Sequence, residues 1–200
     1  MATRTNPPAA QLRRARPDLR IESIRGNVDT RIQKVRDGEF DAVVLAAAGV
    51  KRLNRASEIT EYLTSEQLLP APAQGALAIE IRGYDRDLGK ALEKLDHIQT
   101  RLITTAERAV LVGLDASCQT ALGALATLDG NRLSLVAELS DGETNTHSRA
   151  EAAIVLENGD TMLDEAFQLG LMVAKQLDTT GINVASRADV NSESGTEAND

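Results

Sequence analysis

The chain has 200 residues and a formal net charge of −8 at pH 7, with 42% hydrophobic and only 2% aromatic residues. This length suits one domain or two small ones, and the negative charge disfavours general nucleic-acid binding. No apolar stretch approaches the roughly 20 residues of a membrane-spanning helix, and the first residues carry no apolar secretion signal. With one cysteine, these features predict a cytoplasmic protein without a nucleic-acid or membrane partner.

The charge is unevenly placed along the chain. Residues 1–36 contain nine Lys and Arg against three Asp and Glu, so the remaining residues are strongly acidic. A basic segment on an acidic protein indicates either a local anion site or a solvated, arginine-rich helix face. His97 and His147 lie far apart without the spacing of metal ligands, so we expect no metal site.

The first half of the chain alternates strand and helix patterns. Residues 10–16 could form a helix, and residues 19–24 alternate apolar and polar as a half-buried strand does. A helix is predicted to begin at Val28. Residues 40–46 form the nearly continuous apolar run of a strand covered on both faces, and another helix follows from Val50. This order predicts an α/β fold with a parallel sheet.

Three arginines stand where such a sheet binds ligands. Arg25 and Arg52 lie just past the predicted strands, and Arg31 lies in the first turn of the intervening helix. Ligands of open α/β sheets bind beyond the carboxyl ends of the strands, and helix N-termini favour anions. Since guanidinium groups bind carboxylates bidentately, the spacing predicts a crevice for a polycarboxylate or phosphate.

The pattern changes after residues 69–72, Leu-Pro-Ala-Pro. A strand is predicted over residues 75–81, then helices over residues 84–95 and 98–114. The remaining elements resemble a small α+β unit, with a strong hairpin signal at Asp129-Gly130. They comprise strands over residues 122–128, 132–139 and 150–156 and a helix over residues 161–177, followed by a polar, disordered tail.

Cys118 is the single cysteine of the chain. One thiol forms no internal disulfide, so its possible roles are packing, redox chemistry, nucleophilic catalysis or covalent attachment of a cofactor. From the residue alone, a small buried hydrophobe is the commonest role. The surrounding motifs favour another role.

Six motifs in order closely resemble hydroxymethylbilane synthase, also called porphobilinogen deaminase, over roughly residues 10–180. Each motif is weak alone, but six in register make a strong match. They are Arg16-Pro17-Asp18-Leu19, Arg25-Gly26-Asn27-Val28-Asp29-Thr30-Arg31, Leu45-Ala46-Ala47-Ala48-Gly49-Val50-Lys51-Arg52-Leu53, Pro70-Ala71-Pro72-Ala73-Gln74-Gly75-Ala76, Thr105-Ala106-Glu107-Arg108 and Cys118-Gln119.

The resemblance implies a three-domain enzyme represented by its C-terminal portion. Residues 1–69 would be an incomplete, periplasmic-binding-protein-like second domain, and residues 70–97 would return to a first domain missing here. Residues 98–180 would be a C-terminal α+β domain with a three-stranded antiparallel sheet, and residues 181–200 the tail. The family is usually monomeric. It is a transferase that joins four porphobilinogen units head to tail, releasing ammonia, in haem biosynthesis.

The resemblance also assigns the site residues. Cys118 matches the cysteine that holds a dipyrromethane cofactor through a thioether. Arg25, Arg31 and Arg52 match arginines that bind the acetate and propionate groups of the cofactor and the growing pyrrole chain. The family's catalytic aspartate lies in its N-terminal domain, so we nominate no catalytic residue here.

Departures from the family limit the expected activity. The register leaves Arg13 and Arg14 as ordinary residues on a helix surface, outside the family's arginine pair. Without the N-terminal domain, the chain alone is expected not to make hydroxymethylbilane, and the strand over residues 75–81 would leave apolar surface exposed. Two alternatives stay open: a non-catalytic anion-binding module, and an interaction domain that completes a partner carrying the N-terminal part.

Overall fold

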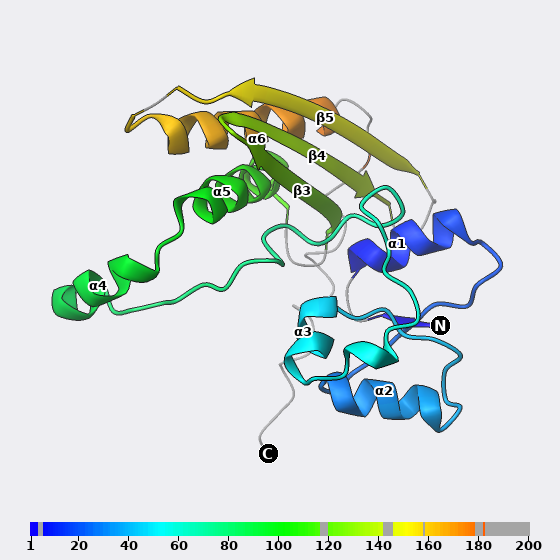
Figure 1. The fold of residues 1–200 in the computed structure, drawn as a ribbon. Helices are drawn as coiled ribbons and strands as arrows, with labels where there is room; N and C mark the ends of the chain where they lie inside the picture. The colour runs from blue at the N-terminus through cyan, green and yellow to red at the C-terminus, as the bar shows by residue number, and fades with distance from the viewer. Residues whose placement is uncertain (4–5, 117–119, 142–145, 158, 179–181, 183–200) are drawn as a thin grey trace, which may run out of the picture.

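The computed structural model describes residues 1–3, 6–116, 120–141, 146–157, 159–178 and 182 (Figure 1). It combines helices with one two-stranded and one three-stranded sheet, as expected for a mixed α/β chain. Most of the predicted C-terminal tail lies outside the described residues. Ile182 is described, and it packs against the hydrophobic core.

The C-terminal unit consists of a three-stranded antiparallel sheet and two long helices. The strands β3 (Ala121–Asp129), β4 (Arg132–Ser140) and β5 (His147–Val155) pair in sequence order. Asp129 pairs with Arg132 across the predicted hairpin turn, where Gly130 adopts a φ of 57°. The helices are α5 (Ile98–Gly113) and α6 (Met162–Asp178). These elements confirm the predicted α+β arrangement.

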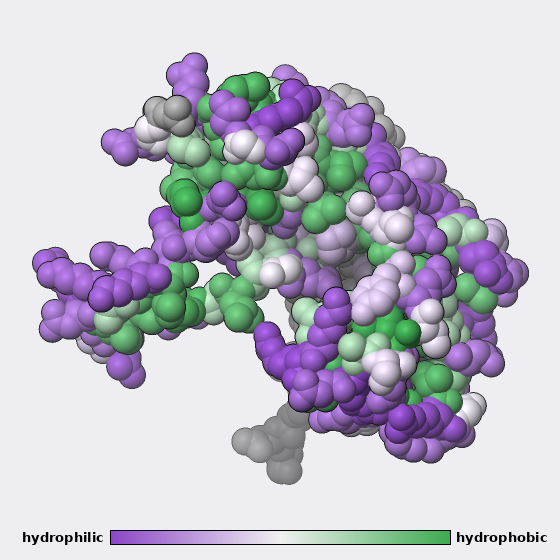
Figure 2. All heavy atoms as spheres, in the orientation of Figure 1, coloured by the Kyte–Doolittle hydropathy of each residue, from purple (hydrophilic) through white to green (hydrophobic). Residues whose placement is uncertain are grey.

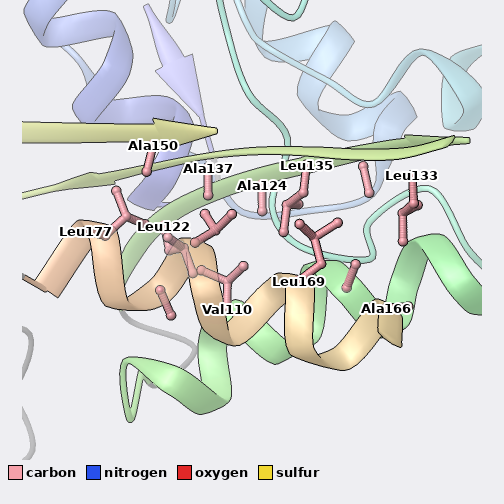
Figure 3. Close-up of a cluster of buried hydrophobic side chains, with 14 of the residues drawn as sticks. Val110, Leu122, Ala124, Leu133, Leu135, Ala137, Ala150, Ala166, Leu169 and Leu177 are labelled. Carbon is pink, nitrogen blue, oxygen red and sulfur yellow. The ribbon is translucent and has the colours of Figure 1, made fainter. Parts of the chain in front are cut away.

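The core lies between one face of this sheet and the two helices. Figure 3 shows side chains from the strands pointing toward α5 and α6. The helices approach closely at Gly170, where an added Cβ would lie 2.3 Å from the carbonyl oxygen of Ala106. The buried apolar residues follow the predicted helical periodicity and strand alternation, and include Leu102, Ala106, Val110, Leu114, Leu122, Ala124, Ala126, Leu133, Leu135, Ala137, Leu139, Leu169, Val173 and Leu177.

The region before α5 has shorter elements and fewer buried side chains. Strands β1 (Ala2–Thr3) and β2 (Glu22–Ser23) form a parallel pair. The helical segments are α1 (Asn6–Ala15), α2 (Val28–Arg36), α3 (Ala47–Arg52), η1 (Ala56–Glu58), α4 (Arg86–Leu92) and η2 (Glu93–Leu95). The predicted helices are therefore present.

Two predicted strands are wrong in the described structure. Within residues 40–46 only Val43 makes an isolated bridge, and residues 77–81 are irregular and exposed. A strand is stabilised by hydrogen bonds to a neighbouring strand, so an apolar pattern does not form one by itself. Among the described residues, the parallel ladder is confined to the two residues each of β1 and β2.

An apolar arm, residues 77–97, extends from the molecule. Figure 1 places α4 at its end, and Figure 2 shows hydrophobic surface along it. Leu77 is 83% exposed and Ile79 is 59% exposed. The predicted exposure of apolar side chains is therefore observed, although the segment is not a strand. Across the described residues, every helix is too short or too polar to cross a membrane.

Candidate functional site

Arg25 lies in the turn between β2 and α2 and is exposed to solvent. Gly26 has a φ of 115°, a conformation that disfavours other residues. Asn27 then caps α2, because its Oδ1 accepts a 2.8 Å hydrogen bond from the N–H of Thr30. Arg31 follows one turn into the helix and is partly buried. The cap therefore fixes the direction of α2 relative to the turn that carries Arg25.

Arg52 is the last residue of α3, which packs against the start of α2. A Cβ added to Gly49 would lie 3.4 Å from Cγ2 of Val28. Just beyond α3, Arg55 forms an ion pair with Asp29 on α2. The elements that carry the three predicted arginines are thus in contact, while the convergence of the three guanidinium groups on one ligand stays a prediction.

The electrostatics distinguish Arg25 and Arg52 from their neighbours. Within the described part of the chain, neither of these two exposed side chains forms an ion pair or hydrogen bond with another described residue. Nearby arginines are paired with carboxylates, and the hydrogen bond from Arg55 lowers the pKa of Glu58. These pairs are Arg16–Asp18, Arg20–Glu22, Arg36–Glu58, Arg55–Asp29 and Arg55–Glu58. Two cations at the predicted crevice are therefore open to an external anion.

Cys118 lies outside the described residues, but the structure defines the helix that precedes it. The N–H of Ala116 donates to the carbonyl of Leu111 at 2.9 Å, and that of Asp115 to Val112 at 3.2 Å. Asp115 adopts a φ of 48°. This combination is a Schellman motif, which ends α5. The described structure resumes at Thr120, and strand β3 begins at Ala121.

Glu107 on α5 is a buried carboxylate that joins two separate backbone segments. Its Oε2 accepts from the N–H of Ala73 at 2.6 Å, and its Oε1 accepts from Ala126 on β3 at 2.9 Å. Burial raises the pKa of Glu107, and the two backbone hydrogen bonds oppose that shift. The bond from Ala126 also satisfies one N–H on the free edge of β3. The sequence did not lead us to this role of Glu107. The available signal was a charged residue next to the apolar face of a predicted helix.

Arg14 corrects another sequence expectation. It was predicted to be an ordinary surface residue of a helix, yet its Nη1 lies 2.7 Å from Oε1 of Glu138 on β4. The Glu138 side chain has 0% exposure. Arg13 is also engaged, since its Nη2 donates to the carbonyl of Ile21 at 3.4 Å. Glu138 lies 124 residues from Arg14 in the sequence, so local patterns do not reveal this partner.

The two histidines have local positions in the structure. His97 precedes α5 as its N-cap, with Nδ1 accepting from the N–H of Thr100 at 3.2 Å. His147 is exposed at the start of β5. Within the described residues, no three His, Cys, Asp or Glu side chains are grouped to hold a metal ion.

Two family models match the chain in succession. Residues 2–90 match the model described as porphobilinogen deaminase, dipyromethane cofactor binding domain. Residues 102–179 match the model described as porphobilinogen deaminase, C-terminal domain. The first model covers the three arginines, and the second covers the sheet and the segment with Cys118.

Curated relatives with the name porphobilinogen deaminase give the same result. The chain is 49% identical over 143 residues to the protein of Sorangium cellulosum, covering 72% of this chain and 48% of that one. It is 44% identical over 172 residues to that of Chromobacterium violaceum, with 86% and 53% covered, and 45% identical over 180 residues to that of Leifsonia xyli, with 86% and 54% covered. The chain thus spans about half the length of the curated relatives it matches. It belongs to the porphobilinogen deaminase family.

Proposed function

We propose that the chain contributes the cofactor-binding and C-terminal parts of a hydroxymethylbilane synthase. This transferase joins four porphobilinogen units head to tail and releases one ammonia at each addition. The observation that carries the proposal is the match of two consecutive family models, one of them for the cofactor-binding domain. The chain alone is proposed to be inactive, because no residue in it is assigned the role of the family's catalytic aspartate.

The proposed ligand is a dipyrromethane cofactor attached through a thioether to Cys118. When bound, it supplies the pyrrole carbon to which each new unit is added. Arg25, Arg31 and Arg52 would hold the acetate and propionate carboxylates, since each pyrrole brings two negative charges. Arg25 and Arg52 fit this role because they are exposed and, among the described residues, have no carboxylate partner.

The proposed domain organisation follows the family. Residues 1–69 would belong to a periplasmic-binding-protein-like domain, and residues 98–180 to the C-terminal domain. The apolar arm, residues 77–97, would pack against the N-terminal part of the family. Leu77, Ile79 and Ile81 alternate along the arm and are exposed, as expected for a segment that pairs with a further strand.

The proposed setting is a reducing cytoplasm and a monomeric enzyme. One cysteine in 200 residues suits a compartment where thiols stay reduced. The proposed partners are porphobilinogen and its oligomers, with neither nucleic acid nor a membrane involved. The net charge of −8 is consistent with the first of these exclusions.

Intact mass spectrometry after incubation with preformed hydroxymethylbilane tests the cofactor assignment. The thiol would displace the hydroxyl of the ligand, forming a carbon–sulfur bond and releasing water. We expect a mass increase that matches linked pyrroles, and its loss in Cys118→Ala. An unchanged mass of the wild-type chain would favour the alternative, a non-catalytic anion-binding module.

Coexpression tests the role of the arm. The chain would be produced with the N-terminal half of the Chromobacterium violaceum relative, and formation of hydroxymethylbilane from porphobilinogen would be followed. We expect product from the pair and none from the chain alone. Product from the purified chain alone would contradict the proposed division of roles.

A further inference from the structure

One row of residues crosses the C-terminal sheet on the face opposite the core. Gly123 on β3 pairs with Glu138 on β4, which pairs with Arg149 on β5. The neighbouring residues Leu122 and Leu139 have their side chains in the core. Because side chains alternate along a strand, the Gly123–Glu138–Arg149 row lies on the other face.

Helix α1 lies over this row. Arg14 Nη1 is 2.7 Å from Glu138 Oε1, and Arg149 Nη1 is 3.5 Å from Glu138 Oε2. Gln11, three residues before Arg14, is only 2% exposed. Residues three apart share a helix face, so both side chains approach the sheet together. A buried carboxylate is tolerated when it is paired and hydrogen-bonded, and Arg14 is the closer of the two cations.

Gln11 and Gly123 also hold the segment before the domain boundary. Gln11 Nε2 donates to the carbonyl of Leu69 at 3.0 Å, and its Oε1 accepts from the N–H of Leu69 at 2.7 Å. The approach requires a glycine on β3. A Cβ at Gly123 would lie 2.7 Å from Leu69 Cβ and 2.9 Å from Gln11 Nε2.

These contacts connect the two parts of the proposed site. On one side, Arg13 donates to the carbonyl of Ile21, and β2 and Arg25 follow directly. On the other side, β3 begins three residues after Cys118. The α1–sheet junction, defined as Gln11, Arg14, Gly123, Glu138 and Arg149, therefore joins the strand that follows Cys118 in the sequence to the helix that contacts the segment before Arg25.

We propose that Gln11 and Arg14 are positioning residues that hold the Cys118 anchor in register with the arginine crevice. The inference rests on the proposed function, because it concerns a ligand bound at both places. Neither residue touches the reacting atoms in this role. They act by holding α1 on the three-stranded sheet, whose first strand is β3. In this way they also hold β2 and Arg25. Misplacement by about 1 Å can slow a reaction on the order of 100-fold.

Two rates measured by intact mass test the proposal. The first is attachment of preformed hydroxymethylbilane to Cys118, and the second is alkylation of Cys118 by iodoacetamide, a small neutral reagent without carboxylates. In Arg14→Met we expect pyrrole attachment to slow by about tenfold or more while alkylation is unchanged. Arg14→Lys should recover part of the attachment rate, because it restores a cation near Glu138.

A matched control and a second variant keep the test decisive. Arg101→Met removes an exposed ion pair with Asp96 and should leave both rates unchanged. Gly123→Ala disturbs the junction by steric contact without altering charge, and should slow attachment as Arg14→Met does. If Arg14→Met does not fold, Arg14→Lys and Gly123→Ala replace it in the comparison. Circular dichroism checks that each variant is folded.

The possible failures are distinguishable. The positioning role alone would be overturned if the wild-type chain attaches the pyrrole and the folded variants attach it at the same rate. These variants are Arg14→Met, Arg14→Lys and Gly123→Ala. Equal changes in attachment and alkylation would also overturn it, since they would indicate a general structural effect. No attachment in the wild-type chain would overturn the proposed function and the positioning role together.

Discussion

The C-terminal unit, residues 98–178, buries most of its apolar side chains between sheet and helices, whereas the apolar arm, residues 77–97, leaves its own in solvent. Leu135 on β4 is 1% exposed, and Leu77 on the arm is 83% exposed. Hydrophobic burial stabilises a fold roughly in proportion to the apolar area removed from water. The C-terminal unit therefore carries its own stability, while the arm has surface that a further polypeptide could cover.

Leucine truncation should separate the two regions most strongly. Leu135→Ala leaves a cavity in the core and should lower the free energy of unfolding by about 2–5 kcal/mol. Leu77→Ala removes a side chain already in water and should change it by less than about 0.5 kcal/mol. Urea unfolding followed by circular dichroism measures both, and equal losses would contradict the comparison.

Overpacking at the helix crossing should have the next largest effect. Gly170→Ala would place a Cβ 2.4 Å from that of Ala109, so α5 and α6 would have to separate. We expect a loss of about 1–3 kcal/mol. Gly75→Ala is the matched control, because no atom lies within 4 Å of the added Cβ. A thermal melt in which both variants behave alike would argue against close packing here.

Two carboxylates should give pH dependences of opposite sign. Burial raises the pKa of Glu107 above 4.5, so its protonation stabilises the folded state below that value, and this contribution is lost as pH rises through the raised pKa. The hydrogen bond from Arg55 lowers the pKa of Glu58, whose contribution is present above 4.5 and is lost as pH falls through the lowered pKa.

The corresponding Gln variants test these signs. The linkage contribution that Glu107→Gln removes should shrink as pH rises above about 4.5, and the one that Glu58→Gln removes should shrink as pH falls below about 4.5. Urea unfolding of wild type and both variants between about pH 3 and pH 7 gives the two slopes. Slopes of the same sign would show that one of the two environments is wrongly described.

The smallest effect is expected at the end of α5. Asp115 has a φ of 48°, where a side chain is unfavourable and glycine is preferred. Asp115→Gly should stabilise the C-terminal unit by about 0.5–1 kcal/mol. Asp129→Gly on β3 is the control. Asp129 does not lie in the left-handed region, so glycine should give no stabilisation there. Destabilisation by Asp115→Gly would contradict the Schellman geometry.

The sequence predicted the C-terminal unit well because its signals are local. Helical periodicity identified α5 and α6, and Asp129-Gly130 identified the turn between β3 and β4. The apolar run over residues 40–46 was misleading, because a strand also requires a neighbour that the run itself does not specify. The same limit applies to residues 77–81, which were predicted as part of a strand but are irregular.

The assignment of the site residues stays a prediction. The resemblance named Arg25, Arg31 and Arg52, and the structure adds that α2 and α3 are in contact and that Arg25 and Arg52 have no ion pair among the described residues. The role of Arg14 was missed, because Glu138 is 124 residues away along the chain. Cys118 stays a prediction, since it lies outside the described residues.

Amide hydrogen exchange followed by mass spectrometry tests the contrast between the two regions most directly. Exchange is slow where backbone hydrogen bonds open only with the core and fast where they are exposed. The account predicts slow exchange in β4, α5 and α6 of the isolated chain, and fast exchange over residues 77–97. Uniform protection across both regions, or an arm that exchanges as slowly as β4, would contradict it.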